Sequence, residues 1–359
     1  MIDNISIQNF KCFESIDLSL GMLNIFSGIN GMGKSTAIQS LLLVKQSQEQ
    51  YPSLQYLILN GDYTTLGVGK DILYENADKD EITFTFNDKS GELIIKASYE
   101  AESDILNADL LNSSIIESLK SDFEYINAGR LSPQTVYEKS SLYVNNKFQL
   151  GIFGQYTAHY LAIHQDDPVE EDGKSYTLKD LTQRWLDKIS PNIKLNIKTI
   201  PNTDLAQINY YYTQAPTAIK TAEYRPTNVG FGISYVLPVI TALLKANSGD
   251  ILIIENPEAH LHPHGQLEMG ELIARSAARG VQIFIETHSD HVLNGIRIGV
   301  KNHLIHAEAT KLFFFEAVPE DGKIKHIAQT PQILPDGRLD FWPDGFFDEW
   351  EKALDQIIY

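Results

Sequence analysis

The sequence contains a single cysteine, Cys12, among its 359 residues. One cysteine excludes a disulfide framework and any zinc site built from cysteines, and it fits a reducing compartment. No window approaches the roughly 18 consecutive apolar residues of a membrane span. The N-terminal residues contain no basic region followed by an apolar stretch, so no secretory signal is expected. We therefore expect a cytoplasmic protein that makes no use of a membrane.

Positive charge is also scarce. The chain has 29 lysines and arginines against 47 aspartates and glutamates, which gives a formal net charge of −18. Nonspecific binding to nucleic acid depends on many basic side chains that displace counterions, so a protein that coats nucleic acid is disfavoured, although a local basic strip would escape this argument. Because 43% of the residues are hydrophobic, the chain can bury a large core, and global disorder is excluded.

Strand and helix patterns alternate along the chain. Near-continuous apolar runs at 250–255 and 280–286, joined by a helix, are typical of central parallel strands. Two alternating segments separated by a turn, 81–86 and 92–97, predict an antiparallel hairpin. Further strands are expected at 5–10, 16–20, 23–27, 193–200 and 206–213, and helices at 36–47 and about 234–244.

The middle of the chain, residues 137–189, reads as a helical insertion. It contains helical patterns at 153–163 and 178–189 with an acidic loop at 165–173 between them. A C-terminal segment, 320–359, is expected to pack on the rest, because Phe346, Phe347, Trp350 and Leu354 follow helical spacing. We interpret residues 1–359 as one α/β domain with a mixed N-terminal sheet, a central parallel sheet and this insertion.

A phosphate-binding motif begins at Gly28. The residues Gly-Ile-Asn-Gly-Met-Gly-Lys-Ser fit the pattern G-x-x-x-x-G-K-[ST], directly after an apolar strand and before a helix. In such a loop the backbone N–H groups point at phosphates and the helix N-terminus favours anions. Lys34 is expected to reach the β and γ phosphates and the Ser35 hydroxyl to ligate Mg²⁺. The predicted nucleotide-binding residues are Asn30, Gly31, Gly33, Lys34, Ser35 and Thr36.

Polar residues follow the two most apolar strands. Glu255 ends the first of them, and ligands of open α/β sheets lie at such carboxyl ends, so Glu255 is predicted to hold Mg²⁺ together with Ser35, through water. Glu258 follows three residues later. His288 ends the second strand and is expected to touch the γ-phosphate, with a purely structural histidine as the alternative.

Taken together, these residues resemble a known family. The segment Asn9-Phe10-Lys11-Cys12-Phe13, the phosphate loop and the polar segments 255–263 and 286–290 are similar to ABC-type ATPase heads of the SMC, RecF and OLD group. The strongest likeness is to small stand-alone bacterial ATPases, several of which accompany nuclease partners in phage-defence operons. The closing segment 342–348 also resembles that subgroup.

The resemblance implies a composite site. In such heads, ATP on the phosphate loop of one subunit is covered by a signature segment of a second subunit. Residues 228–235 occupy that position, and Gly230, Gly232 and Ser234 are expected to contact the nucleotide. The usual signature serine corresponds to Gly230, so Asn228 or Ser234 would have to supply the missing polar contact.

A second departure concerns catalysis. Heads of this group commonly carry two adjacent acidic residues after the strand, but here Asn256 follows Glu255. An amide cannot accept a proton, so the base is expected to be Glu258, with Glu255 and His288 as the other catalytic residues, or hydrolysis is weak.

The resemblance therefore implies an ATPase that uses ATP and Mg²⁺, dimerises head to head on ATP and controls an effector such as a nuclease encoded nearby. Bacterial anti-phage defence or DNA maintenance is the expected setting, with nucleic acid contacted through the partner. The alternatives are a nucleotide-binding regulator with little hydrolysis and a RecF-like repair ATPase that acts on DNA directly. A self-sufficient nuclease is disfavoured, because only 71 residues follow His288.

Three weaker interpretations remain. The alternating His260, His262 and His264 could bind a metal, but phosphate chemistry explains them more simply. Arg130 either approaches the nucleotide or caps a turn. Asn60 lies about where such heads carry a metal-sensing glutamine.

Overall fold

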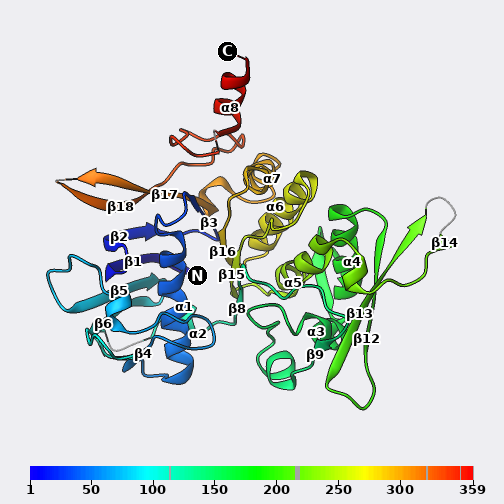
Figure 1. The fold of residues 1–359 in the computed structure, drawn as a ribbon, viewed down its shortest axis with the longest axis horizontal. Coiled ribbons are helices and arrows are strands. Elements are labelled where there is room, and N and C mark those ends of the chain that lie inside the picture. Colours follow the sequence, from blue (N-terminus) through cyan, green and yellow to red (C-terminus); the bar gives the residue numbers. More distant parts are fainter. Residues whose placement is uncertain (113–114, 215–218, 321, 348, 359) are drawn as a thin grey trace. The chain divides into compact units, whose positions relative to one another are not determined.

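The computed structural model describes residues 1–112, 115–214, 219–320, 322–347 and 349–358, and the chain divides into two units (Figure 1). The first unit comprises Met1–Asp122 and His306–Tyr359, and the second comprises Phe123–Ile305. None of the described helices combines the length and the apolar character that crossing a membrane requires.

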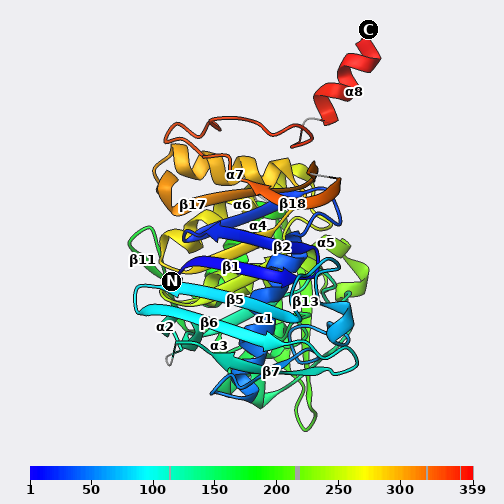
Figure 2. The same cartoon turned by 90° about the vertical axis from the view of Figure 1, so that its left-hand side faces the viewer.

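The first unit contains an antiparallel sheet with the strand order β2-β1-β5-β6-β7-β4. Figure 2 shows β2, β1, β5, β6 and β7 side by side. The strands are β1 (Ile2–Phe10), β2 (Phe13–Ser19), β4 (Tyr56–Ile58), β5 (Glu81–Asp88), β6 (Gly91–Ser98) and β7 (Ile105–Leu110). The hairpin predicted at 81–97 is confirmed as β5 and β6. Where we expected a mixed sheet, every described pairing is antiparallel, because short turns join successive strands such as β1 and β2.

A second group of strands in the first unit holds the phosphate loop. β3 (Leu23–Gly28) pairs in parallel with β17 (Thr310–Glu320), and β17 pairs antiparallel with β18 (Lys323–Gln329). Helix α1 (Lys34–Gln50) follows the loop and covers the predicted range 36–47. Gln46 and Ser47 of α1 tie it to β4: Gln46 Nε2 donates to Ile58 O at 2.6 Å, and Ile58 N donates to Ser47 Oγ at 2.8 Å. Short helix α2 (Glu117–Lys120) completes this part of the chain.

The C-terminal segment belongs to the first unit. Phe346 is 1% exposed, and its ring lies 5.3 Å from that of Phe314 in β17 and 5.5 Å from that of Trp342. The last helix, α8 (Glu349–Ile358), begins after these contacts. Phe346 and Phe347 therefore precede the helix that their spacing predicts, and the left-handed backbone of Phe347, with φ 55°, does not allow the helix to include it.

The second unit contains the other apolar strands. β15 (Ile251–Glu255) pairs in parallel with β16 (Gln282–Glu286) on one side and with β8 (Phe123–Ile126) on the other. Both central strands are thus confirmed. Helix α6 (Pro263–Ala278) connects β15 to β16, and α7 (Asp290–Lys301) follows β16. The two helices meet at Gly270 and Gly295. A Cβ on Gly270 would lie 2.2 Å from Val292 O and one on Gly295 would lie 2.2 Å from Leu267 O, so neither position has room for a side chain.

The expected helical insertion, 137–189, has mixed structure. It contains β9 (Tyr137–Glu138), a π-helical turn (Leu142–Asn146), α3 (Thr157–His164) and α4 (Leu178–Ile189). The acidic loop expected at 165–173 is largely a hairpin of β10 (Pro168–Glu171) and β11 (Lys174–Thr177). Its two-residue turn, Asp172 and Gly173, has φ values of 51° and 70°, which is the geometry that matches the twist of a tight hairpin. After it come β12 (Ile193–Thr199), β13 (Leu205–Gln214), β14 (Ile219–Lys220) and α5 (Phe231–Lys245).

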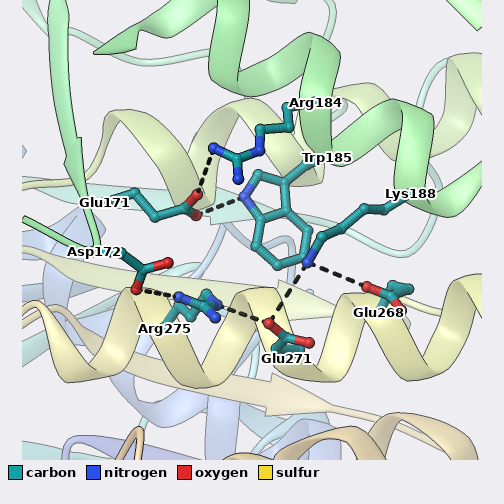
Figure 3. A network of polar contacts seen from close by, with 8 residues as sticks. All are labelled: Glu171, Asp172, Arg184, Trp185, Lys188, Glu268, Glu271 and Arg275. Atoms are coloured by element: carbon teal, nitrogen blue, oxygen red, sulfur yellow. Dashed lines mark hydrogen bonds and ion pairs between the residues drawn. The ribbon is translucent and has the colours of Figure 1, made fainter. Parts of the chain in front are cut away.

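A network around Trp185 holds the insertion against α6 (Figure 3). The Trp185 ring is 1% exposed, and its Nε1 donates to Glu171 Oε1 at 2.8 Å. Lys188 Nζ lies 3.9 Å from the ring centre and within 3.6 Å of carboxylates of Glu268 and Glu271 on α6. Apolar burial of the indole is the main stabilising contribution here, because partly exposed ion pairs contribute about 0–1 kcal/mol.

Candidate functional site

The phosphate loop lies in the first unit, between β3 and α1. Gly28, Gly31 and Gly33 have φ values of 132°, 81° and 112°, a region that side chains rarely adopt. A Cβ on Gly28 would also meet the carbonyl oxygen of Phe315 at 2.3 Å, and one on Gly33 would meet the ring of Phe13 at 2.5 Å. Backbone conformation and lack of space therefore both require glycine at these two positions.

Lys34 is buried within this loop. Its side chain reaches back over the loop, and Nζ donates to Gly28 O at 2.8 Å and to Ile29 O at 2.9 Å. The first turn of α1 has no acidic residue, so its N-terminal N–H groups and the lysine give a local positive potential in an acidic protein. Ser35 is exposed, while Thr36 is buried and accepts a hydrogen bond from Cys12 Sγ at 3.7 Å. The structure brings together the predicted loop residues Asn30, Gly31, Gly33, Lys34, Ser35 and Thr36.

The predicted acidic residues lie in the second unit. Glu255 ends β15, and both its carboxylate oxygens accept hydrogen bonds: Oε1 from the Tyr125 hydroxyl at 2.8 Å and Oε2 from Ala128 N at 3.1 Å. Burial, followed by the negative charge of Glu255, raises the pKa of Tyr125, so the hydroxyl remains a donor. The carboxylate is thereby held in one orientation at the end of the strand.

Glu258 and His288 lie side by side. The backbone N–H of His288 donates to Glu258 Oε1 at 2.8 Å, whereas Oε2 is buried without a hydrogen-bond partner in the described structure. Burial raises the pKa of Glu258, and the hydrogen bond from His288 N opposes this shift. The His288 side chain is exposed just before Ser289, which caps α7 by accepting from Val292 N at 3.1 Å. A carboxyl with raised pKa and a free oxygen is chemically suited to accept a proton.

Asn256 adopts a left-handed conformation with φ 46° directly after Glu255. Its N–H donates to Glu286 O at 2.8 Å, and its carbonyl accepts from Ala259 N at 3.1 Å. The backbone of Asn256 therefore closes the turn after β15, which brings Glu258 back beside His288.

The segment 228–235 forms the entry to α5. Gly230 and Asn228 are exposed, and Gly230 precedes the helix without a side-chain cap. A Cβ on Gly232 would meet His260 O at 2.3 Å, so this glycine is needed for close packing. Ser234 is 8% exposed, and its hydroxyl lies 3.2 Å from that of Tyr210. The hydroxyl of Ser234 thus faces the interior of its own unit, which does not fit the expected contact with a nucleotide.

Two side chains that the sequence analysis weighed have structural roles. The side-chain amide of Asn60 makes two hydrogen bonds to the backbone of Gly67: Nδ2 donates to Gly67 O and Oδ1 accepts from Gly67 N, both at 2.9 Å. The ring of His260 packs 4.6 Å from Phe231 and 4.9 Å from Tyr235, an aromatic contact with α5. Neither arrangement is that of a metal sensor or a metal ligand.

Tyr125 and Tyr235 have no role that the sequence predicts, and the role of Arg130 is open from the sequence. Tyr125 orients Glu255, as described above. Arg130 is 4% exposed and donates to the carbonyl oxygens of Glu255 and Asn256 at 2.7 and 2.6 Å. Its guanidinium also lies 4.5 Å from the centre of the Tyr235 ring. In the sequence, Tyr125 is visible only as a tyrosine within a strand and Arg130 only as an arginine after it. Tertiary structure is needed to reveal their partners.

Comparison with known proteins confirms the class to which these features point. A strand, a glycine loop, a helix and apolar parallel strands that end in acidic residues define an ABC-type P-loop ATPase head. The chain belongs to the family described as "AAA domain, putative AbiEii toxin, Type IV TA system", whose profile matches residues 23–294. Residues 305–357 match a second family, "Protein of unknown function (DUF3696)".

Solved structures show the same fold. An SMC head bound to the C-winged helix domain of ScpA is 15% identical with a TM-score of 0.54, and the match covers 92% of this chain and 98% of that one. The SMC head of Pyrococcus furiosus, with an extended coiled coil and bound to the C-terminal domain of ScpA, is 12% identical with a TM-score of 0.53 and coverage of 100% and 99%. The resemblance to SMC heads is thus confirmed at the level of fold.

Sequence relatives match shorter segments. An OLD nuclease of Thermus scotoductus is 36% identical over 63 residues, which is 18% of this chain and 12% of that protein. The protein MJECL10 of Methanocaldococcus jannaschii is 29% identical over 129 residues, 34% of this chain and 55% of that protein. The chain therefore spans only part of the length of these relatives.

Proposed function

We propose that this protein is a Mg²⁺-dependent ATPase that works slowly as a switch: ATP closes two heads into a dimer, and this closure controls an effector protein. The observation that carries the proposal is the phosphate loop, in which three glycines with positive φ lead into a helix without acidic residues in its first turn. Such a loop is built to hold polyphosphate.

The metal requires oxygen ligands. We assign Ser35 and Glu255 to Mg²⁺, with Glu255 acting through water. The fit of Glu255 rests on its two accepted hydrogen bonds, which hold the carboxylate in one orientation at the end of β15. Bound Mg²⁺ would supply charge neutralisation at the phosphates.

Proton acceptance falls to Glu258. Its raised pKa and its free Oε2 support the assignment, and Asn256, as an amide, cannot take this role. His288, exposed beside Glu258, is assigned to the γ-phosphate. Because Glu258, farther along the turn, replaces the second acidic residue of the usual adjacent pair, hydrolysis is expected to be slow.

The dimer would use the entry to α5. Gly230 and Gly232 offer backbone N–H groups at a helix N-terminus, and exposed Asn228 rather than buried Ser234 supplies the side-chain contact. The surplus of acidic residues makes direct gripping of DNA unfavourable, so we assign any nucleic-acid contact to the partner. A nuclease effector and a role in anti-phage defence in the cytoplasm fit the short match to an OLD nuclease and the toxin–antitoxin description of the family.

A second candidate function is a nucleotide-binding regulator with negligible hydrolysis, and Asn256 is the observation that favours it. Phosphate release by the wild type and by Lys34→Ala separates the two. A wild-type rate above that of Lys34→Ala supports the ATPase, whereas equal, near-zero rates with retained ATP binding support the regulator.

Lys45→Ala is the matched control for Lys34→Ala. Lys45 lies on the same helix and is also buried, but its Nζ donates to Leu119 O at 2.9 Å rather than to the phosphate loop. We expect Lys34→Ala to bind ATP about 10- to 100-fold more weakly, because hydrogen bonds to charged groups contribute about 1.5–3 kcal/mol. Lys45→Ala should bind ATP as the wild type does. A wild type that stays monomeric at saturating ATP and Mg²⁺ in light scattering would contradict the dimer.

A further inference from the structure

Arg130 is a buried cation that makes no ion pair with a carboxylate in the part of the chain that the structure describes, although the charges of Glu258 and Glu255 act on it from farther away. Its side chain is 4% exposed, and its Nη atoms donate to three backbone carbonyls: those of Asn127 at 3.3 Å, Glu255 at 2.7 Å and Asn256 at 2.6 Å. Its Nε is buried and has no hydrogen-bond partner in the described structure. Arginine is seldom buried in this way, because desolvating a cation is costly.

The carbonyls that Arg130 binds lie at the end of β15. Two of its hydrogen bonds hold the backbone of Glu255 and Asn256, the residues between the strand and the turn that carries Glu258. Charge-assisted bonds from a planar guanidinium fix both position and direction. Arg130 therefore holds the backbone at the end of β15.

The other face of Arg130 rests on α5. The guanidinium carbon lies 4.5 Å from the ring centre of Tyr235, which is one turn into that helix and 8% exposed. The Tyr235 hydroxyl donates to Ala128 O, and Ala128 N donates to Glu255 Oε2 at 3.1 Å. The ring of Tyr235 also contacts His260 at 4.9 Å. Tyr235 thus touches the loop after β8 and the loop after β15 at once.

Close packing reinforces this link. The first turn of α5 lies against the turn after β15, since Gly232 has no room for a Cβ beside His260 O. Phe231, the first residue of α5, packs 4.6 Å from the His260 ring. Because Gly232 lies directly against His260 O, we expect a displacement of the α5 N-terminus toward this turn to move the residues after β15.

We propose that Arg130 is a positioning residue which, stacked on Tyr235, transmits the position of the α5 N-terminus to the catalytic end of β15. This inference rests on the proposed function, in which the α5 entry contacts the nucleotide of the partner subunit. Engagement of the partner at α5 would then set the geometry of Glu255 and of the turn that carries Glu258, so that each subunit hydrolyses its own ATP only when it is also covering the ATP of its partner.

Substitution and steady-state kinetics give the first test. Arg130→Met removes the donors, Arg130→Lys keeps the charge without the planar fork, and Tyr235→Leu removes the ring while Tyr235→Phe removes only the hydroxyl. We expect Arg130→Met and Tyr235→Leu to lower kcat by about tenfold or more while KM for ATP stays within about twofold, since small misplacements of catalytic groups have effects of this size. Arg130→Lys should lose less kcat than Arg130→Met, and Tyr235→Phe should lose less kcat than Tyr235→Leu.

Arg279→Met is the matched control. Arg279 is another arginine of the second unit whose Nη2 donates to a backbone carbonyl, that of Leu243, and whose buried Nε has no hydrogen-bond partner in the described structure. It lies at the end of α6, beside the segment that enters β15, and so at the opposite end of that strand from Glu255. An equal loss of kcat in Arg279→Met and Arg130→Met would overturn the proposal, because it would show a general effect of removing a buried arginine.

Additivity gives a second criterion. The double variant Arg130→Met/Tyr235→Leu should have a kcat close to that of the lower single variant, because both changes break the same link. If the two substitutions instead lowered kcat by independent factors that multiply in the double variant, the proposed coupling would be overturned. A KM for ATP that rises in Arg130→Met with kcat unchanged would also overturn it, and would place Arg130 at the nucleotide instead.

Hydrogen exchange tests the link without ATP. In nucleotide-free protein, Tyr235→Leu should raise amide exchange in peptides that span 255–262 more than Tyr235→Phe does, and this result would support the link even if the wild type did not hydrolyse ATP. An increase confined to α5 would overturn it. Because phosphate release by the wild type and Lys34→Ala tests the ATPase separately, failure of this inference is distinguishable from failure of the proposed function.

Discussion

The ring of Phe13 occupies the space that a side chain on Gly33 would need: a Cβ at Gly33 would lie 2.5 Å from Phe13 Cζ. Phe13 begins β2, is fully buried, and therefore cannot move aside without disturbing the core of the first unit. The turn between β1 and β2 and the phosphate loop, which lie 20 residues apart in sequence, are thus packed as one rigid piece.

A matched pair of glycine substitutions tests this packing. Gly31 and Gly33 both have positive φ, but a Cβ on Gly31 would meet no atom within 4 Å. Backbone strain should lower the free energy of unfolding by about 1 kcal/mol in both Gly31→Ala and Gly33→Ala. Gly33→Ala should lose about 1–3 kcal/mol more because of the clash. Urea unfolding measures the difference, and equal losses in the two variants would show that Phe13 yields easily.

Glu258→Gln separates stability from activity. The pKa of Glu258 is raised in the folded protein, so the folded state holds the proton more tightly, and the stability that this provides is present at low pH and lost as the pH rises through the raised pKa. Glutamine keeps the oxygen that accepts from His288 N and carries no charge. We expect the variant to be more stable than wild type at pH 7, by about 1 kcal/mol, and the gain to disappear near pH 4.

Activity should move in the opposite direction. A base must be deprotonated, so wild-type kcat should increase with pH through the raised pKa of Glu258, and Glu258→Gln should lose at least about 100-fold in kcat together with this pH dependence. Thermal melts and phosphate release over the same pH series provide both readouts. Retained hydrolysis in Glu258→Gln would remove Glu258 as the base.

Gly230→Asp tests the contact between subunits. Gly230 is exposed at the entry to α5, and a Cβ there would meet only Ile233 Cδ1, at 3.7 Å, so the fold should tolerate the change. The new negative charge should repel a phosphate presented by the partner subunit. We expect normal ATP binding to the phosphate loop and loss of ATP-dependent dimerisation, measured by light scattering. Asn228→Asp, nearby and also exposed, should weaken the dimer less if the backbone of Gly230 is the main contact.

The sequence predicted best those features that short segments encode. The phosphate loop follows from its glycines, and β15 and β16 follow from apolar runs that only a buried strand explains. The hairpin of β10 and β11 also had a local signal, the Asp172-Gly173 pair between alternating strands, which the acidic composition of the segment concealed.

The contacts of the second unit could not be predicted in the same way. Arg130 and Asn256 are separated by 126 residues, and nothing in either segment identifies the other. Ser234 shows a related limit: its position in the signature segment favours a nucleotide contact, whereas the structure places its hydroxyl beside that of Tyr210. Side-chain direction on a helix depends on which face packs, and that is decided by tertiary structure.

A buried ion pair joins β8 to the end of α5, and its removal should be costly. Glu124 and Lys245 have side chains that are 7% and 10% exposed, and Lys245 Nζ lies 2.8 Å from Glu124 Oε2. Lys245→Met leaves the carboxylate buried with the N–H of Leu150 as its hydrogen-bond donor in the described structure, so we expect the free energy of unfolding to fall by about 3 kcal/mol or more. The double variant Glu124→Gln/Lys245→Met should recover most of this loss, because no uncompensated charge remains. Urea unfolding checks both, and a double variant as unstable as Lys245→Met would show that packing of the lysine stem, rather than charge, is what stabilises this contact.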